Sequence, residues 1–104
     1  MAKILFVDDE QLMCEIATQF FRMKNHQVTT ASCYSDALTI LERESFDVLL
    51  VDINMPGTKN GLDLLRDVST NIKKSQIILI TGMPSLDTAT EALRLGAFDY
   101  ILKP

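Results

Sequence analysis

Short apolar runs rich in Ile, Leu and Val recur along the chain, and most of them end at Asp, Thr or Lys. Runs of this kind are typical of strands that are covered on both faces of a parallel sheet. We therefore predict five strands, at Lys3–Val7, Gln27–Ala31, Val48–Asp52, Gln76–Thr81 and residues 100–102.

The segment between the first two predicted strands has helical periodicity. A single apolar stripe recurs there at helical spacing and consists of Met13, Ile16, Ala17, Phe20 and Met23. We expect this helix to end at Asn25, because asparagine tolerates the left-handed backbone conformation that closes many helices.

Three further helices are expected in the later connections. The second follows Ser32 or Ser35, either of which could cap it, and turns three apolar side chains inward: Ala37, Ile40 and Leu41. The third spans about residues 62–70, and the fourth spans about residues 86–95 and stops at Gly96. This alternation with short connections is the pattern of a doubly wound α/β domain around a parallel sheet.

Composition narrows the class of protein. A chain of 104 residues has the size of one domain. Its net charge is −4 and its basic residues are scattered, which argues against direct binding of nucleic acid. Cys14 and Cys33 form no CxxC motif, a usage that fits a reducing cytoplasm. No apolar stretch approaches the ~20 residues of a membrane span, so we expect a soluble protein that does not enter a membrane.

Polar residues follow or end four of the predicted strands. Carboxylates lie after the first strand and at the end of the third, a hydroxyl ends the fourth, and an amine follows the fifth. These residues are Asp8, Asp9, Asp52, Thr81 and Lys103. Because the strands are expected to be parallel, all five should lie along one edge of the sheet, where this architecture binds ligands.

The chemistry of this set is that of phosphoryl transfer. Oxygen ligands without His or Cys favour a hard cation, so the three carboxylates predict a Mg²⁺ site. A lysine supplies positive charge for a phosphoryl group or for a carboxylate, and a threonine hydroxyl supplies a hydrogen bond. Together these groups suit in-line transfer of a phosphoryl group onto a carboxylate.

Four segments, in this order, resemble the receiver domain of bacterial two-component response regulators, and the resemblance covers the whole chain. They read ILFVDDE, LLVDINMPG, ITG and GAFDYILKP, at residues 4–10, 49–57, 80–82 and 96–104. The resemblance implies a flavodoxin-like sheet with strand order 2-1-3-4-5 in one domain, residues 1–104. The family has one more helix after the fifth strand, so we expect a domain that is truncated there and lacks its last helix.

The resemblance also implies the roles of the acidic residues. Asp52 would be the phosphoacceptor and would take its phosphoryl group from a phosphohistidine on a sensor histidine kinase. Mg²⁺ would be held by Asp8, Asp9, Asp52 and the backbone carbonyl of Asn54. The protein would thus be a cytoplasmic signalling domain that depends on Mg²⁺.

By the same resemblance, the remaining residues would form a switch. Lys103 would pair with the phosphoryl oxygens, Thr81 would move toward them, and Tyr100 would turn into the space that Thr81 leaves. This change would control an output domain or a downstream effector protein. The protein would not be an enzyme in the usual sense, because it would catalyse only its own phosphorylation and dephosphorylation.

Plainer interpretations stay open for the single residues. Asp8 and Asp9 could cap the first helix, and Asp52 and Lys103 could form an ordinary ion pair. Thr81 alone is most often a turn residue, and Tyr100 alone is most often a core residue with a polar tip. Their joint occurrence at strand ends favours the functional interpretation.

Two other functions use similar groups. An aspartate-nucleophile, Mg²⁺-dependent phosphatase of the haloacid dehalogenase type would carry Asp-x-Asp-x-Thr on its first strand, whereas Asp52 here lies on the third. A receiver-like interaction module that is never phosphorylated usually lacks one of the site residues, and this chain has all of them.

The chain departs from the family pattern at two places. The loop from Gly57 to Gly61 is one residue longer than usual, and we favour a longer turn over a placement of Lys59 near the phosphorylation site. Without the last helix, apolar sheet surface would be exposed. We therefore expect either self-association, as a homodimer or an aberrant oligomer, or marginal stability.

Overall fold

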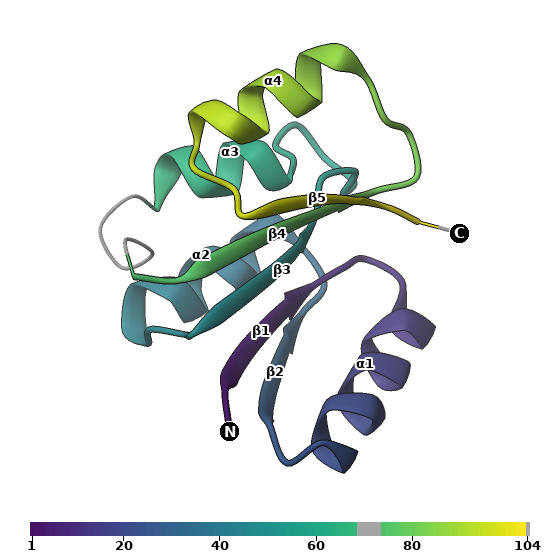
Figure 1. Ribbon diagram of the computed structural model, residues 1–104, viewed down its shortest axis with the longest axis vertical. Coiled ribbons are helices and arrows are strands. Elements are labelled where there is room, and N and C mark those ends of the chain that lie inside the picture. Colours follow the sequence, from purple (N-terminus) through teal and green to yellow (C-terminus); the bar gives the residue numbers. More distant parts are fainter. Residues whose placement is uncertain (69–73, 104) are drawn as a thin grey trace.

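A five-stranded parallel sheet forms the centre of the computed structural model, which describes residues 1–68 and 74–103 (Figure 1). The strands are β1 (Lys3–Val7), β2 (Gln27–Ala31), β3 (Val48–Asp52), β4 (Gln76–Thr81) and β5 (Asp99–Leu102). Their order is β2-β1-β3-β4-β5, and each neighbouring pair is parallel. The predicted fold class and strand order are confirmed, and β5 begins one residue earlier than predicted.

The described residues form four helices, one after each of the first four strands. They are α1 (Gln11–Met23), α2 (Tyr34–Arg43), α3 (Gly61–Asp67) and α4 (Leu86–Arg94). The predicted stops at Asn25 and Gly96 are confirmed, since both residues have positive φ values, 66° and 80°. The third helix ends at Asp67, earlier than predicted, and residues 69 and 70 of that prediction lie outside the described residues.

The predicted capping residue of α2 was wrong, and the plainer interpretation of Asp8 or Asp9 as the cap of α1 does not hold either. The N-cap of α2 is Cys33 rather than Ser32 or Ser35, and its side chain makes no capping hydrogen bond. The N-cap of α1 is Glu10 rather than Asp8 or Asp9. In both segments the observed cap directly follows one of these candidates, because the backbone path of the strand-to-helix turn decides where the helix begins.

Helix α3 has a cap that the sequence analysis did not predict. Oδ1 of Asn60 accepts hydrogen bonds from the backbone N–H groups of Leu62 and Asp63, at 2.9 and 3.1 Å. The carboxylate of Asp63 accepts in return from the backbone N–H of Asn60 at 2.8 Å. This capping box fixes the point at which the loop after β3 becomes a helix.

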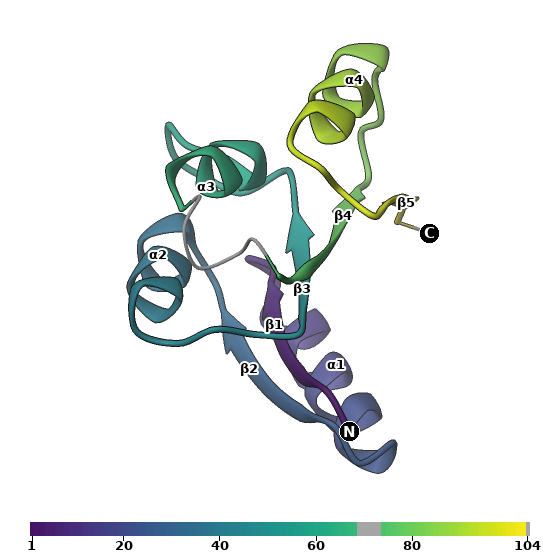
Figure 2. The ribbon, with the colours of Figure 1, turned by 60° about the vertical axis from the view of Figure 1, so that its left-hand side comes forward.

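The two faces of the sheet are covered unequally (Figure 2). Helices α2, α3 and α4 contribute to one large core, in which the inward side chains Ala37 and Leu41 are fully buried, as predicted, and Ile40 packs against them. On the opposite face, α1 contributes Cys14 and Ala17 to a smaller cluster around Phe6.

Only part of the apolar stripe of α1 is buried. Ala17 is buried and Met13 is half-buried, whereas Ile16, Phe20 and Met23 are 51%, 53% and 80% exposed. The helix rests on the sheet through the line of Cys14 and Ala17, which turns the rest of the stripe away from it. These exposed side chains belong to the helix and not to the sheet surface whose exposure was expected.

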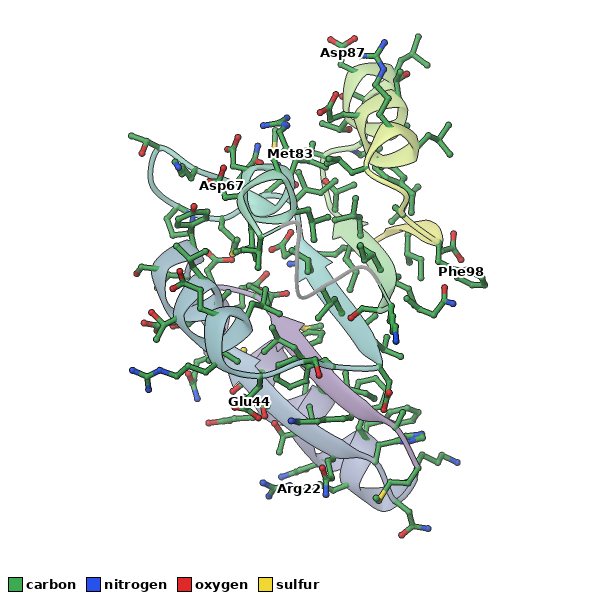
Figure 3. The ribbon with its side chains drawn as sticks, turned by 90° about the vertical axis from the view of Figure 1, so that its left-hand side faces the viewer. Arg22, Glu44, Asp67, Met83, Asp87 and Phe98 are labelled. Carbon is green, nitrogen blue, oxygen red and sulfur yellow. The ribbon has the colours of Figure 1, made fainter. Side chains whose placement is uncertain are left out.

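Strand β5 also exposes apolar side chains. Ile101 is 43% exposed and Leu102 is 58% exposed. Phe98, which precedes the strand, projects from the edge of the molecule and is 71% exposed (Figure 3). Among the described residues, no helix is both long enough and apolar enough to cross a bilayer.

Candidate functional site

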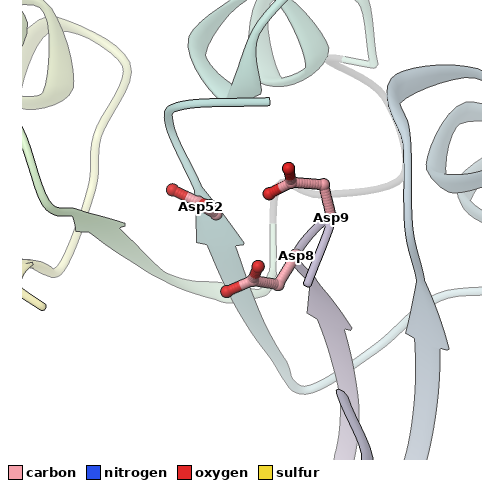
Figure 4. A group of neighbouring side chains, drawn as sticks. All are labelled: Asp8, Asp9 and Asp52. Atoms are coloured by element: carbon pink, nitrogen blue, oxygen red, sulfur yellow. The ribbon is translucent and has the colours of Figure 1, made fainter. Parts of the chain in front are cut away.

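The three predicted carboxylates lie together at the carboxyl ends of β1 and β3 (Figure 4). These strands are neighbours, and Val7 pairs with Val51, so the residues that follow each of them, Asp8 and Asp52, are brought side by side. One carboxylate oxygen from each of Asp8, Asp9 and Asp52 lies within 4.8 Å of the others. Asp8 and Asp52 are only 1% and 2% exposed, whereas Asp9 is exposed.

The ammonium group of Lys103 lies among these acids. Its Nζ is 3.0 Å from Oδ2 of Asp8 and 3.0 Å from Oδ2 of Asp52. A third carboxylate, that of Glu10, lies 3.2 Å away. Burial alone would lower the pKa of Lys103, but its interactions with the carboxylates of Asp52, Asp8 and Glu10 outweigh burial and raise the pKa. Lys103 is therefore held firmly in its charged form.

Burial has the opposite consequence for Asp52. It raises the pKa of this carboxyl group above the ordinary value, although the hydrogen bonds from Lys103 and from the backbone N–H of Asn54 act against it. That N–H donates to Oδ1 of Asp52 at 3.0 Å. The difference between the two partners has a simple cause: the single ammonium is shared by three carboxylates. The charged form of Lys103 is stabilised by all three carboxylates, whereas the charged form of Asp52 is stabilised by an ammonium that it shares with two other acids.

Asp8 has one carboxylate oxygen that lacks a hydrogen-bond donor. Its Oδ1 accepts from the backbone N–H of Glu10 at 2.9 Å. Its Oδ2 is buried, and among the described residues no donor points at it with hydrogen-bond geometry, although Lys103 lies at ion-pair distance. A buried carboxylate oxygen in this condition is rare unless a cation or water completes it. The all-oxygen ligand set therefore fits a hard divalent cation.

Thr81 is fully buried at the end of β4, beside β3. Its hydroxyl donates a hydrogen bond to Oδ1 of Asn54 and accepts one from the backbone N–H of Met83 at 3.0 Å. The Thr81 side chain is thus bound to the loops after β3 and β4, beside the carboxylates.

Tyr100 lies on β5 and connects that strand to the start of α4. Its hydroxyl shares a hydrogen bond of 2.6 Å with the hydroxyl of Thr88 and accepts a longer one, of 3.4 Å, from the backbone N–H of Ser85. The ring is half-buried and packs against the large core. The inward turn that the sequence analysis expects of Tyr100 stays a prediction.

Two residues of this site were missed from the sequence. Glu10 contacts Lys103, and the signal for it was its position directly after the two aspartates. Gly61 packs closely against the backbone of Asp52. A Cβ atom at this position would lie only 2.5 Å from the Asp52 carbonyl oxygen, so a larger residue would not fit without a shift. Nothing in the sequence pattern indicates that close approach.

Lys59 lies away from the carboxylates, in the loop between β3 and α3. Its Nζ is 2.8 Å from Oδ2 of Asp67 and 5.0 Å from the centre of the Tyr34 ring. These contacts, to the C-terminal end of α3 and the start of α2, agree with the favoured interpretation of the longer loop as a longer turn.

A family model described as the response regulator receiver domain matches residues 4–104. The chain belongs to this family. The receiver is 34% identical over 103 residues to response regulator protein FleR of Pseudomonas aeruginosa, covering 99% of the chain and 22% of that protein. It is also 34% identical to regulatory protein AtoC of Escherichia coli, covering 98% of the chain and 22% of that protein. The chain spans about a fifth of the length of these relatives. Its membership of the receiver family favours the receiver hypothesis over the phosphatase alternative.

Solved structures agree with this membership over the full length of the receiver. A CheY-like receiver domain protein from Methanospirillum hungatei matches with a TM-score of 0.93 and 30% identity, covering 100% of this chain and 82% of that one. A Burkholderia pseudomallei response regulator with a phosphorylated aspartic acid, a calcium ion and citrate matches with a TM-score of 0.91 and 26% identity, covering 100% and 61%. Thermotoga maritima TrrA in complex with Mg²⁺ and BeF matches with a TM-score of 0.84 and 27% identity, and the match covers 100% of this chain and 88% of that one.

Proposed function

We propose that this receiver accepts a phosphoryl group on Asp52 from the phosphohistidine of a sensor histidine kinase. The observation that carries the proposal is the burial of the Asp52 carboxylate between a lysine ammonium and two further acids at the carboxyl edge of the sheet. A similar response regulator, from Burkholderia pseudomallei, has a phosphorylated aspartic acid. Receiver domains are signalling switches rather than enzymes with a turnover substrate, and we propose that catalysis here is limited to phosphorylation and dephosphorylation of Asp52.

In the proposed reaction, a carboxylate oxygen of Asp52 attacks the phosphorus atom of the phosphohistidine. The new O–P bond forms as the N–P bond breaks, and the electron pair of that bond returns to the imidazole nitrogen. Asp52 has to be ionised for this attack, and in the cation-free site Lys103 at 3.0 Å favours the ionised form against the effect of burial. After transfer, the same ammonium would compensate the charge of the phosphoryl oxygens.

The residues present fit a bound Mg²⁺ ion. Asp8, Asp9 and Asp52, with the backbone carbonyl of Asn54, would hold it, and the close approach of the three carboxylates supports this assignment. Among the described residues, Oδ2 of Asp8 has the ammonium of Lys103 at ion-pair distance but no hydrogen-bond donor. When bound, the ion would supply positive charge that reduces repulsion between the incoming phosphoryl group and the acids.

The switch would then follow from a change of hydrogen-bond partners. Thr81 would exchange its bond to Asn54 for one to the phosphoryl group, and Tyr100 would leave Thr88 and turn inward. Moving such a switch from mostly off to mostly on takes about 5 kcal/mol of differential stabilisation. The new contacts of Lys103 and Thr81 with a dianionic group are of a kind that could supply it.

The proposed partners are a sensor histidine kinase and an output domain or effector protein. Several relatives, such as MalR of Bacillus subtilis, are named transcriptional regulatory proteins, which supports an output that controls transcription. We propose that the receiver itself binds neither nucleic acid nor membrane and acts in the cytoplasm. The free thiols of Cys14 and Cys33 agree with a reducing compartment.

Intact mass spectrometry tests the phosphoacceptor directly. The chain, Asp52→Asn and a surface control, Asp67→Asn, are incubated with a small-molecule phosphodonor with and without Mg²⁺, after circular dichroism has shown that each is folded. We expect one Mg²⁺-dependent phosphoryl adduct on the unchanged chain and on Asp67→Asn, and none on Asp52→Asn. An adduct that persists in Asp52→Asn, or its absence from the folded unchanged chain, would contradict the proposal.

A further inference from the structure

The ammonium group of Lys103 contacts two of the three carboxylates that would hold a divalent cation. Its Nζ lies 3.0 Å from Oδ2 of Asp8 and 3.0 Å from Oδ2 of Asp52, and both carboxylates belong to the proposed cation site. Two positive groups at these oxygens would repel each other strongly, because Asp8 and Asp52 are buried and water screens the repulsion little there. Lys103 therefore has to give up these contacts when the acids hold a cation.

Glu10 is the third anionic partner of Lys103, and it differs from the other two. Its Oε1 lies 3.2 Å from Nζ, but Glu10 is not a member of the three-carboxylate group whose oxygens lie within 4.8 Å of one another. Its side chain is 61% exposed, whereas Asp8 and Asp52 are buried. Glu10 thus lies at the open side of the site, within reach of the ammonium.

We propose that Glu10 is a positioning residue that holds the Lys103 ammonium when Asp8 and Asp52 bind the divalent cation. This inference rests on the proposed function and adds to it a residue that sets cation affinity. With Glu10 in place, Lys103 exchanges three anionic partners for one and remains beside the site. Without Glu10, it loses every charged partner that the structure gives it.

The sign of the effect follows from comparing the two states of the site. In the cation-free state Lys103 is already compensated by Asp8 and Asp52, so the contribution of exposed Glu10 is small. In the cation-bound state Glu10 is the remaining anionic partner, and its contribution is larger. Glu10 therefore favours the cation-bound state, and its removal should weaken cation binding.

Glu10→Gln is a suitable variant because the Glu10 side chain makes no capping hydrogen bond to α1. Glu15→Gln is the matched control, since Glu15 is an exposed acid in the helix that follows Glu10 and its carboxylate accepts a long bond, of 3.5 Å, from Gln11. Mg²⁺ affinity is measured by calorimetry for both variants, in the unchanged chain and in a Lys103→Gln background.

We expect Glu10→Gln to weaken Mg²⁺ binding roughly two- to fivefold, the range for an exposed ion pair, and more than Glu15→Gln does. In the Lys103→Gln background the two variants should have equal effects, because the group that Glu10 positions is gone. In Mg²⁺-saturated protein, the NMR signal of Lys103 Cε should move toward that of a free lysine in Glu10→Gln only.

Three results would overturn the inference, and they fall into two kinds. An equal loss of Mg²⁺ affinity in both backgrounds would show that Glu10 acts through its own negative charge and not through Lys103. No loss of affinity in Glu10→Gln would show that Glu10 does not affect cation binding. In either case the Mg²⁺ site and the proposed function would stand. Failure of the unchanged chain to bind Mg²⁺ would instead overturn the proposed function together with this inference.

Discussion

The hydroxyl of Thr81 donates a hydrogen bond to Oδ1 of Asn54, a residue that lies 27 positions earlier and only two after Asp52. This bond ties Thr81, at the end of β4, to the loop after β3, and it has to break before Thr81 can reach a phosphoryl group. Asn54→Ala is therefore expected to favour the active conformation by about 1 kcal/mol, the net value of one neutral hydrogen bond, or roughly fivefold in the switch equilibrium. The populations of the two conformers can be measured by NMR with Mg²⁺ and BeF.

Thr81 supplies the control for this prediction. Thr81→Val removes the hydroxyl that both states use, so it should abolish the response to BeF, whereas Thr81→Ser should retain it. If Asn54→Ala leaves the conformer populations unchanged, the bond to Asn54 does not restrain the switch.

The close approach of Gly61 to Asp52 leads to a second prediction. In Gly61→Ala the new Cβ atom would meet the Asp52 carbonyl oxygen and Cγ1 of Val51, at 2.5 and 2.8 Å in the unshifted backbone. We expect this overpacking to lower the free energy of unfolding by about 1–3 kcal/mol and to slow phosphorylation, since Asp52 has to move. Thermal unfolding and the rate of adduct formation measure the two effects.

Gly82→Ala is the matched control. A Cβ atom at Gly82 would lie 3.9 Å from Cβ of Lys103, which is ordinary van der Waals contact. This variant should unfold at nearly the temperature of the unchanged chain. Equal stability of Gly61→Ala and Gly82→Ala would contradict the steric argument.

The strands and the site edge could be predicted from the sequence because both depend on local pattern and topology. Four of five strand ranges agree, since buried parallel strands are continuous apolar runs. Parallel neighbours bring their carboxyl ends together, and this places Asp8 beside Asp52 without any knowledge of side-chain conformation.

The contacts within the site could not be predicted, because they depend on distances between side chains that only the folded backbone sets. The bond from Thr81 to Asn54 and the ion pair between Glu10 and Lys103 are of this kind. The exposure of Ile16 and Phe20 was also missed, since periodicity identifies an apolar stripe but not how much of it a single sheet face covers.

The exposed apolar side chains of α1 and β5 predict self-association of this chain. Ile16 and Phe20 on α1, and Ile101 and Leu102 on the edge strand β5, are each at least 43% exposed. Because side chains alternate along a strand, Ile101 and Leu102 point to opposite faces of the sheet. We expect sedimentation to show a concentration-dependent oligomer, and Phe20→Lys to shift it toward monomer. A monomer at all concentrations with cooperative unfolding would contradict this prediction.

The opposite pKa shifts of Asp52 and Asp67 predict opposite effects of removing their charges. Burial raises the pKa of Asp52 above its ordinary value of 3.8, so the folded protein binds this proton more tightly than the unfolded chain does. Its ionisation therefore lowers stability as pH rises from 3.8 through the raised value. Asp52→Asn should unfold at a higher temperature than the unchanged chain at neutral pH, and the difference should vanish below pH 3.8. Lys103 keeps Asp8 and Glu10 as partners in this variant.

Asp67 has the reverse shift and is the natural comparison. A hydrogen bond from Lys59 and, to a smaller extent, one from Tyr34 lower the pKa of Asp67 below its ordinary value of 3.8. Its ionised form therefore adds stability that is present above pH 3.8 and is lost as pH falls through the lowered value. Asp67→Asn should unfold at a slightly lower temperature at neutral pH, because an exposed ion pair contributes little. Melting curves of both variants between pH 3 and pH 8 check the signs, and a destabilised Asp52→Asn at neutral pH would mean that pairing with Lys103 outweighs the burial of this carboxylate.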